Sequence, residues 1–143
     1  MTDSHGIPLK AVLSPGQRHE VPVFPMLMDA VRLPRSGGPP RRRPRWLAGD
    51  KAYGYGPIYE YLRRRGIGAV IPQRSGKCVG HPRLPVDPDT YKRRNAVERA
   101  VGWLKGCRSI ATRHDKLAIS FMAMLKLAFI RQYLRILEPS DRT

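Results

Sequence analysis

Acidic residues are scarce in this chain of 143 residues, where 11 aspartates and glutamates stand against 27 lysines and arginines, giving a formal net charge of +16. Such an excess of one sign repels itself unless an anionic partner neutralises it, so nucleic acid is the expected partner. Ribosomal proteins, DNA enzymes and basic tails share this charge balance. The charge therefore selects a class of partner and no chemistry.

Cysteine is almost absent as well. Cys78 and Cys107 are the only two, and no Cys-x-x-Cys motif occurs, which argues against a disulfide scaffold. The first residues, MTDSHGIPLK, lack the basic start and apolar run of a secretory signal. Lys126 interrupts the apolar segment 116–137 before it reaches the ~18 uncharged residues of a membrane-spanning helix. We therefore expect a cytoplasmic, nucleoid-associated protein with no membrane partner.

Turn residues divide the chain into short elements. We expect strands at 7–14, 45–50 and 69–72, and helices at 23–33, 56–66, 91–108 and 116–137, the last helix being buried. Two flexible loops are expected at 36–45, which contains four arginines, and at 73–88. The first loop is interpreted as a solvated charge run or, alternatively, as a loop that touches phosphate. This order predicts a single α/β domain over residues 1–143, with helices packed on a mixed sheet.

The segment YKRRNAVERAVGWLKGCR, residues 91–108, contains one acid, Glu98, among six bases. On a helix of ~100° per residue, Tyr91, Arg94, Glu98 and Lys105 share a stripe. An apolar arc lies beside the stripe and consists of Ala96, Val97, Ala100, Val101, Trp103, Leu104 and Cys107.

Two interpretations of Glu98 follow from this pattern. In the first, Arg94 and Glu98 form a structural i, i+4 pair, which adds roughly 0.2–0.5 kcal/mol to a helix. In the second, Glu98 is a metal ligand together with Asp50, which ends a predicted strand. A strand-end carboxylate facing a helical carboxylate is a geometry that can hold a divalent metal.

The same residues resemble the Y-x2-R-x3-E-x6-K signature of bacterial insertion-sequence DDE transposases, of the insertion-sequence-four and -five groups. The segment LAGDKAYG looks like the part of that family that bears its second catalytic aspartate, here Asp50. The stretch CRSIATRHDKLA is similar to R-x-x-A-T-R-Y-D-K of the insertion-sequence-five group, with His114 where a tyrosine is common. The resemblance extends from GIPLKAVLSPGQ to the last helix.

This resemblance implies a ribonuclease-H-like fold in which three acids bind two Mg²⁺ or Mn²⁺ ions for DNA cleavage and strand transfer. Asp50 and Glu98 match two of these acids, as catalytic and metal-binding residues. The DNA backbone of transposon ends and target would be held by Tyr91, Arg94, Lys105, Arg108, Arg113 and Lys116. Oligomers with itself or with full-length transposase are expected.

The chain departs from the family pattern at its start. The first aspartate of the family lies on an opening strand ahead of the segment that resembles GIPLKAVLSPGQ, and Asp3 looks instead like a turn acid. We therefore expect the C-terminal part of a catalytic domain, lacking the opening strands, with weak metal binding and no activity alone. Two origins fit this departure: a decayed reading frame, or a second frame that is joined by frameshifting to an upstream one carrying the missing acid.

Two other functions are compatible with the charge. A non-catalytic basic fragment that coats DNA would make no use of Asp50 or Glu98. A ribosomal-type RNA-binding protein is permitted by the charge, but the ordered motifs do not suggest it.

Overall fold

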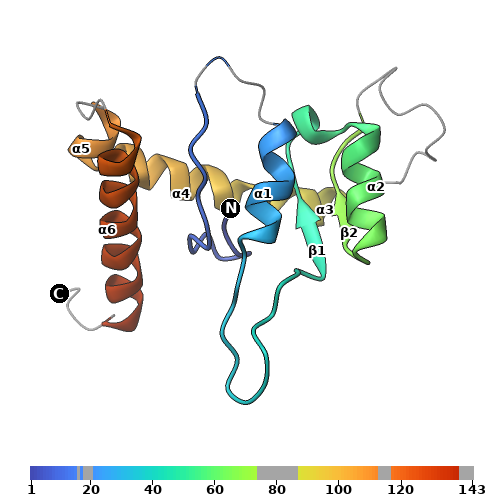
Figure 1. Ribbon diagram of the computed structural model, residues 1–143, viewed down its shortest axis with the longest axis horizontal. Coiled ribbons are helices and arrows are strands. Elements are labelled where there is room, and N and C mark those ends of the chain that lie inside the picture. Colours follow the sequence, from blue (N-terminus) through green and yellow to red (C-terminus); the bar gives the residue numbers. More distant parts are fainter. Residues whose placement is uncertain (16, 18–20, 74–86, 113–116, 139–143) are drawn as a thin grey trace. The chain divides into compact units, whose positions relative to one another are not determined.

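The computed structural model, shown in Figure 1, describes residues 1–15, 17, 21–73, 87–112 and 117–138. The chain divides into two compact units, one of residues 14–94 and one of residues 1–13 together with 95–143. The architecture is mixed α/β, with a two-stranded parallel sheet and several helices. Most of the loop predicted at 73–88 lies outside the described residues.

The unit of residues 14–94 is built around a strand–helix–strand element. Strands β1 (Trp46–Ala48) and β2 (Gly68–Val70) pair in parallel, and helix α2 (Gly56–Arg64) connects them. Parallel strands require such a crossover, because a tight turn can join only antiparallel neighbours. The strands predicted at 45–50 and 69–72 and the helix predicted at 56–66 are thus confirmed to within a few residues.

The ends of α2 follow from its proline and glycine. Pro57 lies in the first turn, where backbone N–H groups have no partner within the helix, so the N–H that proline lacks is not missed. Gly66 follows the helix with a φ of +62°, a left-handed conformation that favours glycine. Leu62 is fully buried, and the Tyr59 hydroxyl donates a hydrogen bond to the carbonyl of Ile71 at 2.7 Å. The helix is therefore fixed against the segment that follows β2.

Helix α1 (Phe24–Asp29) follows a short 3₁₀ turn, η1 (Val21–Val23), and is shorter than the helix predicted at 23–33. Its Phe24 and Met28 side chains are buried in the core of this unit. The helix ends at Asp29, and four residues later Leu33 pairs with Arg41 of the returning chain.

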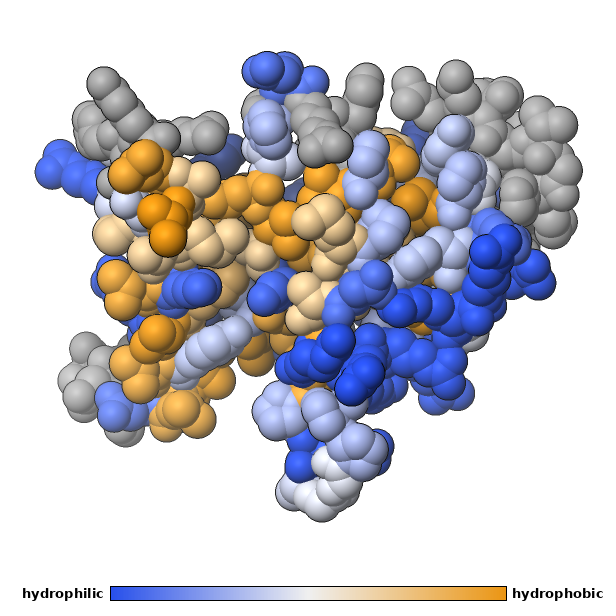
Figure 2. Space-filling model, in the orientation of Figure 1, coloured by the Kyte–Doolittle hydropathy of each residue, from blue (hydrophilic) through white to orange (hydrophobic). Residues whose placement is uncertain are grey.

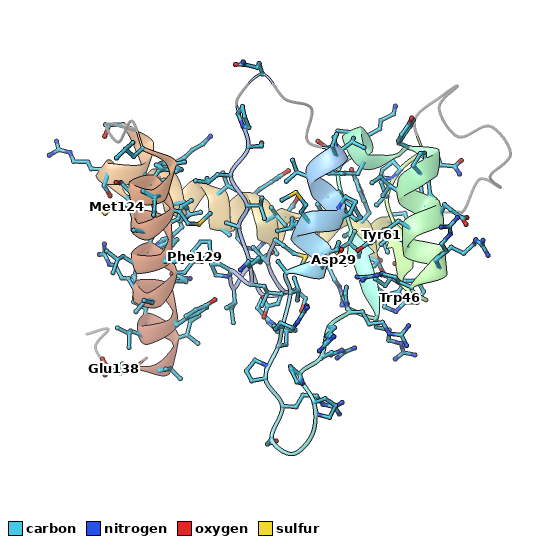
Figure 3. The ribbon with its side chains drawn as sticks, viewed as in Figure 1. Asp29, Trp46, Tyr61, Met124, Phe129 and Glu138 are labelled. Atoms are coloured by element: carbon cyan, nitrogen blue, oxygen red, sulfur yellow. The ribbon has the colours of Figure 1, made fainter. Side chains whose placement is uncertain are left out.

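A polar cluster joins α1 to α2. Asp29 of α1 accepts a hydrogen bond from the Tyr61 hydroxyl at 3.0 Å and pairs with the Arg65 guanidinium at 2.6 Å. Figure 3 shows Asp29 and Tyr61 between the two helices. Burial, and then the hydrogen bond to Asp29, raise the pKa of Tyr61. Asp29 is thus occupied by structural contacts.

In the other unit, the first residues form a turn, so the strand predicted at 7–14 is wrong for the described structure. The carboxylate of Asp3 accepts hydrogen bonds from the amides of His5 and Ile7 at 2.8 and 2.9 Å. Gly6 closes this turn with a φ of +89°. The prediction that Asp3 is a turn acid is confirmed, and its carboxylate satisfies backbone amides.

The continuous helix predicted at 91–108 is also wrong. The structure has α3 (Pro88–Lys92), α4 (Asn95–Lys105) and α5 (Arg108–Ala111) in its place, separated by turns. The boundary between the two units falls between α3 and α4. A single helical wheel therefore does not apply to the whole segment, and the predicted stripe holds only within each helix.

Helix α6 (Ala118–Leu137) coincides with the segment predicted to be a buried helix, but that burial prediction is wrong. Leu125 and Ala128 are buried, whereas Ile119 is 79% exposed and Leu127 is 58% exposed. Apolar surface along this helix is visible in Figure 2. None of the described helices has the length and hydropathy that a bilayer span requires.

Candidate active site

Asp50 lies just beyond the carboxyl end of β1, where the structure agrees with its predicted strand-end position. Its side chain is exposed, and its Oδ1 atom accepts a hydrogen bond from the backbone amide of Lys51 at 2.5 Å. Asp50 thereby caps the 3₁₀ turn η2 (Lys51–Tyr53). Ligands of open α/β sheets bind outside the carboxyl ends of the strands, so this carboxylate occupies a position suited to a ligand.

Gly49, directly before Asp50, lies against β2 and the residue that follows it, and no sequence motif pointed to this glycine. Its amide donates to the carbonyl of Val70 at 3.3 Å, and a Cβ at this position would lie 3.2 Å from Cγ1 of the buried Ile71. A side chain at position 49 would therefore make a tighter contact than is usual, and Ile71 would have to shift to make room for it. A glycine directly before a strand-end acid is the signal that could have identified it.

Glu98 and Lys105 lie on one side of α4. Both side chains are exposed, whereas Ala96 and Ala100, about 200° away from Glu98 on the helix, are buried. The buried side of the helix lies close to Gly6, where an added Cβ would be 3.1 Å from the Ala96 carbonyl oxygen.

Two turns of helix separate this acid and this base, or about 10 Å along the axis. Glu98 stands in the first turn of α4 and Lys105 in the last. Each charge is thus at the end where the helix dipole favours it. The apolar arc predicted for this segment is only partly buried, since Val97 and Val101 are exposed at 38% and 43%.

Tyr91 and Arg94 also lie together, at the end of α3. The Arg94 guanidinium stands over the Tyr91 ring, 5.4 Å from its centroid. Asp87 starts this helix by accepting a hydrogen bond from the Thr90 amide at 2.8 Å. A hydrogen bond from the Thr90 hydroxyl lowers the pKa of Asp87, which keeps this cap charged.

The structure therefore brings Tyr91 and Arg94 into contact and places Glu98 and Lys105 on one side of α4. Tyr91 and Arg94 belong to the unit of residues 14–94, as does Asp50, and Glu98 and Lys105 belong to the other unit. Arg108 is exposed at the start of α5. Arg113 and Lys116 lie outside the described residues.

The donor chemistry of these acids suits magnesium or manganese, which prefer carboxylate oxygens. Asp50 and Glu98 are both exposed carboxylates. Among the residues that the structure describes, however, no three His, Cys, Asp or Glu side chains gather into a group that could hold a metal ion. Asp50 and Glu98 are thus the type of ligand that these metals prefer, but two carboxylates are fewer than a metal site needs.

Comparison with known proteins decides the family. The protein-family model of the transposase DDE domain matches residues 1–132 of the chain. The chain belongs to this transposase family. A Burkholderia cepacia protein named as a transposase for insertion sequence element IS402 is 33% identical to this chain over 131 residues. The match covers 89% of this chain and 57% of the relative, so this chain spans little more than half of the relative's length. No solved structure matches this transposase.

These findings confirm the resemblance to insertion-sequence DDE transposases that the motifs predicted. The individual roles of Asp50, Glu98 and the bases are predictions.

Proposed function

We propose that this chain contributes Asp50 and Glu98 to a ribonuclease-H-like active site that cuts and joins DNA strands during transposition. The position of Asp50 carries the proposal. Its carboxylate is exposed beyond the carboxyl end of a parallel strand, within the segment LAGDKAYG, and the family match includes this segment. Glu98 stands on an exposed helical face, as expected of an acid that acts on a partner outside its own helix.

Divalent magnesium or manganese would be held by the carboxylate oxygens of Asp50 and Glu98. When bound, two such ions stabilise the attacking and leaving oxygens of an in-line displacement at phosphorus. Because no group of three potential ligands occurs among the described residues, this chain alone should bind the metal weakly and should not cleave DNA.

The bases near the acids would hold the DNA backbone. Lys105 lies on the same side of α4 as Glu98, so it can contact a phosphate close to that acid. Arg94, stacked on Tyr91, and the exposed Arg108 would provide further contacts, together with Arg113 and Lys116. The partners in this proposal are transposon ends, target DNA and further transposase chains.

A second candidate function is a non-catalytic DNA-binding fragment. The net charge of +16 and the lack of a three-acid group among the described residues favour it. A binder of this kind should keep or gain DNA affinity when acids are removed, since phosphate contacts supply its affinity.

The magnesium dependence of DNA binding separates the two functions. If Asp50 and Glu98 hold metal at the DNA, Mg²⁺ should strengthen binding of transposon-end DNA by the parent chain, and this gain should vanish in Asp50→Ala/Glu98→Ala. The matched control, Asp89→Ala/Glu138→Ala, removes two other exposed acids and should keep the gain. Equal Mg²⁺ responses in all three proteins would support the simple binder.

A further inference from the structure

An ordered hairpin rich in arginine connects α1 to β1. We call residues 33–45 the arginine hairpin. Leu33 and Arg41 close it through two backbone hydrogen bonds of 3.0 and 2.8 Å. Its tip contains Gly37 and Gly38, with φ values of +79° and +121°. Figure 1 shows the hairpin extending away from α1 and β1.

Positive charge accumulates in this hairpin without compensation from its own sequence. Residues 31–49 include six arginines and no acid. The five arginines of the hairpin line an open hollow of about 620 Å³, together with Pro39, Pro40, Pro44 and Gly66. Five guanidinium groups around one hollow repel each other in the absence of an anion.

Two of these arginines hold the hairpin in place. The Arg43 guanidinium donates a hydrogen bond to the carbonyl of Arg65 at the end of α2, where the helix dipole favours a cation. A Cβ on Gly66 would lie 3.0 Å from this guanidinium, so the glycine leaves room for it. Arg41 Nε donates to the carbonyl of Arg43 at 3.1 Å. These contacts are intramolecular and fix the shape of the hollow.

The side chains of the other three arginines, Arg35, Arg42 and Arg45, are exposed, and none of these side chains has a hydrogen bond or ion pair within the described part of the chain. Neighbouring arginines of the same unit differ in this respect. Arg63 and Arg64 both bind Glu60, at 2.9 and 2.8 Å. The unit thus keeps one group of exposed arginines paired with an acid and leaves the side chains of another group unpaired.

We propose that Arg35, Arg42 and Arg45 bind the sugar-phosphate backbone of duplex DNA, as a contact separate from the predicted contacts near Glu98. Guanidinium groups bind phosphate oxygens in a bidentate manner, and several along one hairpin match a polyanion better than a single small anion. The inference rests on the proposed function only in taking DNA as the polyanion.

Trp46 provides a local probe of this contact. It follows Arg45 directly and is 61% exposed, and its ring lies against Gly68, where an added Cβ would be 2.0 Å from Cε3. Trp103 is the other tryptophan of the chain. In the full chain carrying Trp103→Phe, the fluorescence of Trp46 should change when a duplex of random sequence is added.

The test compares two double variants in this background. Arg42→Gln/Arg45→Gln should make the slope of log binding constant against log salt concentration shallower by about two. Each lost phosphate contact lowers the number of released counterions by about one. Arg63→Gln/Arg64→Gln removes the same charge from paired arginines of the same unit and should change the slope less. Circular dichroism and thermal unfolding check that both variants fold.

Three results would overturn the inference. Equal changes of slope in both double variants would show a general charge effect. An unchanged Trp46 signal on saturation with duplex would place the DNA elsewhere. A full Trp46 response to inorganic phosphate alone, not reversed by duplex, would show a site for a free anion. The proposed function is tested separately, since Glu98→Gln should leave the hairpin contact intact.

Discussion

The carboxylate of Asp50 accepts a hydrogen bond from the backbone amide of Lys51 at 2.5 Å. The same carboxylate is the proposed metal ligand, so one side chain combines a structural cap with a functional charge. Asparagine caps a helix about as well as aspartate and carries no charge. Substitution can therefore separate the two roles.

Asp50→Ala should lower the free energy of unfolding by about 1 kcal/mol, the usual cost of losing a cap. Asp50→Asn should leave this free energy almost unchanged, because its amide oxygen can accept the same hydrogen bond. Urea denaturation of the three proteins is the measurement. If Asn and Ala destabilise the chain equally, the charge of Asp50, and not its cap, contributes to stability.

The contact between Trp46 and Gly68 predicts a coupled pair of substitutions. An alanine Cβ at position 68 would lie 2.0 Å from the indole ring, so Gly68→Ala should cost about 1–3 kcal/mol as the ring is displaced. In a Trp46→Ala background the same change should cost almost nothing. A double-mutant cycle of unfolding free energies measures this coupling, and additive effects would show that the ring does not cover Gly68.

Glu60 predicts a pH dependence of stability. Hydrogen bonds from Arg63 first, and then from Arg64, lower its pKa from 4.5 to about 2. A carboxylate with a lowered folded-state pKa stabilises the fold above its unfolded pKa, and this contribution is lost as the pH falls towards the folded value. Between about pH 4.5 and 2, the parent should therefore lose more stability than Glu60→Gln. Urea midpoints measured across this range test it, and parallel curves would contradict the pairing in solution.

Local signals in the sequence were sufficient for the strand–helix–strand element. Pro57 and Gly66 mark the ends of α2, and short apolar runs mark β1 and β2. The place of Asp50 just beyond the end of a strand was predictable for the same reason. These features depend on nearest neighbours, which a single sequence displays.

Features that depend on distant contacts could not be predicted. The helical wheel for residues 91–108 assumed one helix, yet the chain turns between α3 and α4. The spacing of apolar residues in the sequence does not indicate this turn. The apolar pattern of α6 shows that the helix can be buried and does not show which face is covered. Arg43 and Arg65 are 22 residues apart, so the bond that fixes the arginine hairpin is invisible in the sequence.

Metal binding should be weak and should depend on both acids. Two carboxylates form only part of a site for a hard cation. Calorimetry should detect weak Mg²⁺ or Mn²⁺ binding by the parent chain, further reduced in Asp50→Asn and in Glu98→Gln. Tight binding that survives both substitutions would place the metal at other residues.

DNA cleavage by a longer chain tests the central claim that Asp50 and Glu98 are catalytic acids. The 143-residue chain, extended by the aspartate-bearing strands that the family resemblance implies, should nick transposon-end DNA in the presence of Mg²⁺. Glu98→Gln in this longer chain should abolish nicking, while its DNA affinity measured without Mg²⁺ should stay close to that of the parent, because the substitution preserves shape and removes one negative charge. Nicking at the parent rate by the Glu98→Gln protein would contradict the account.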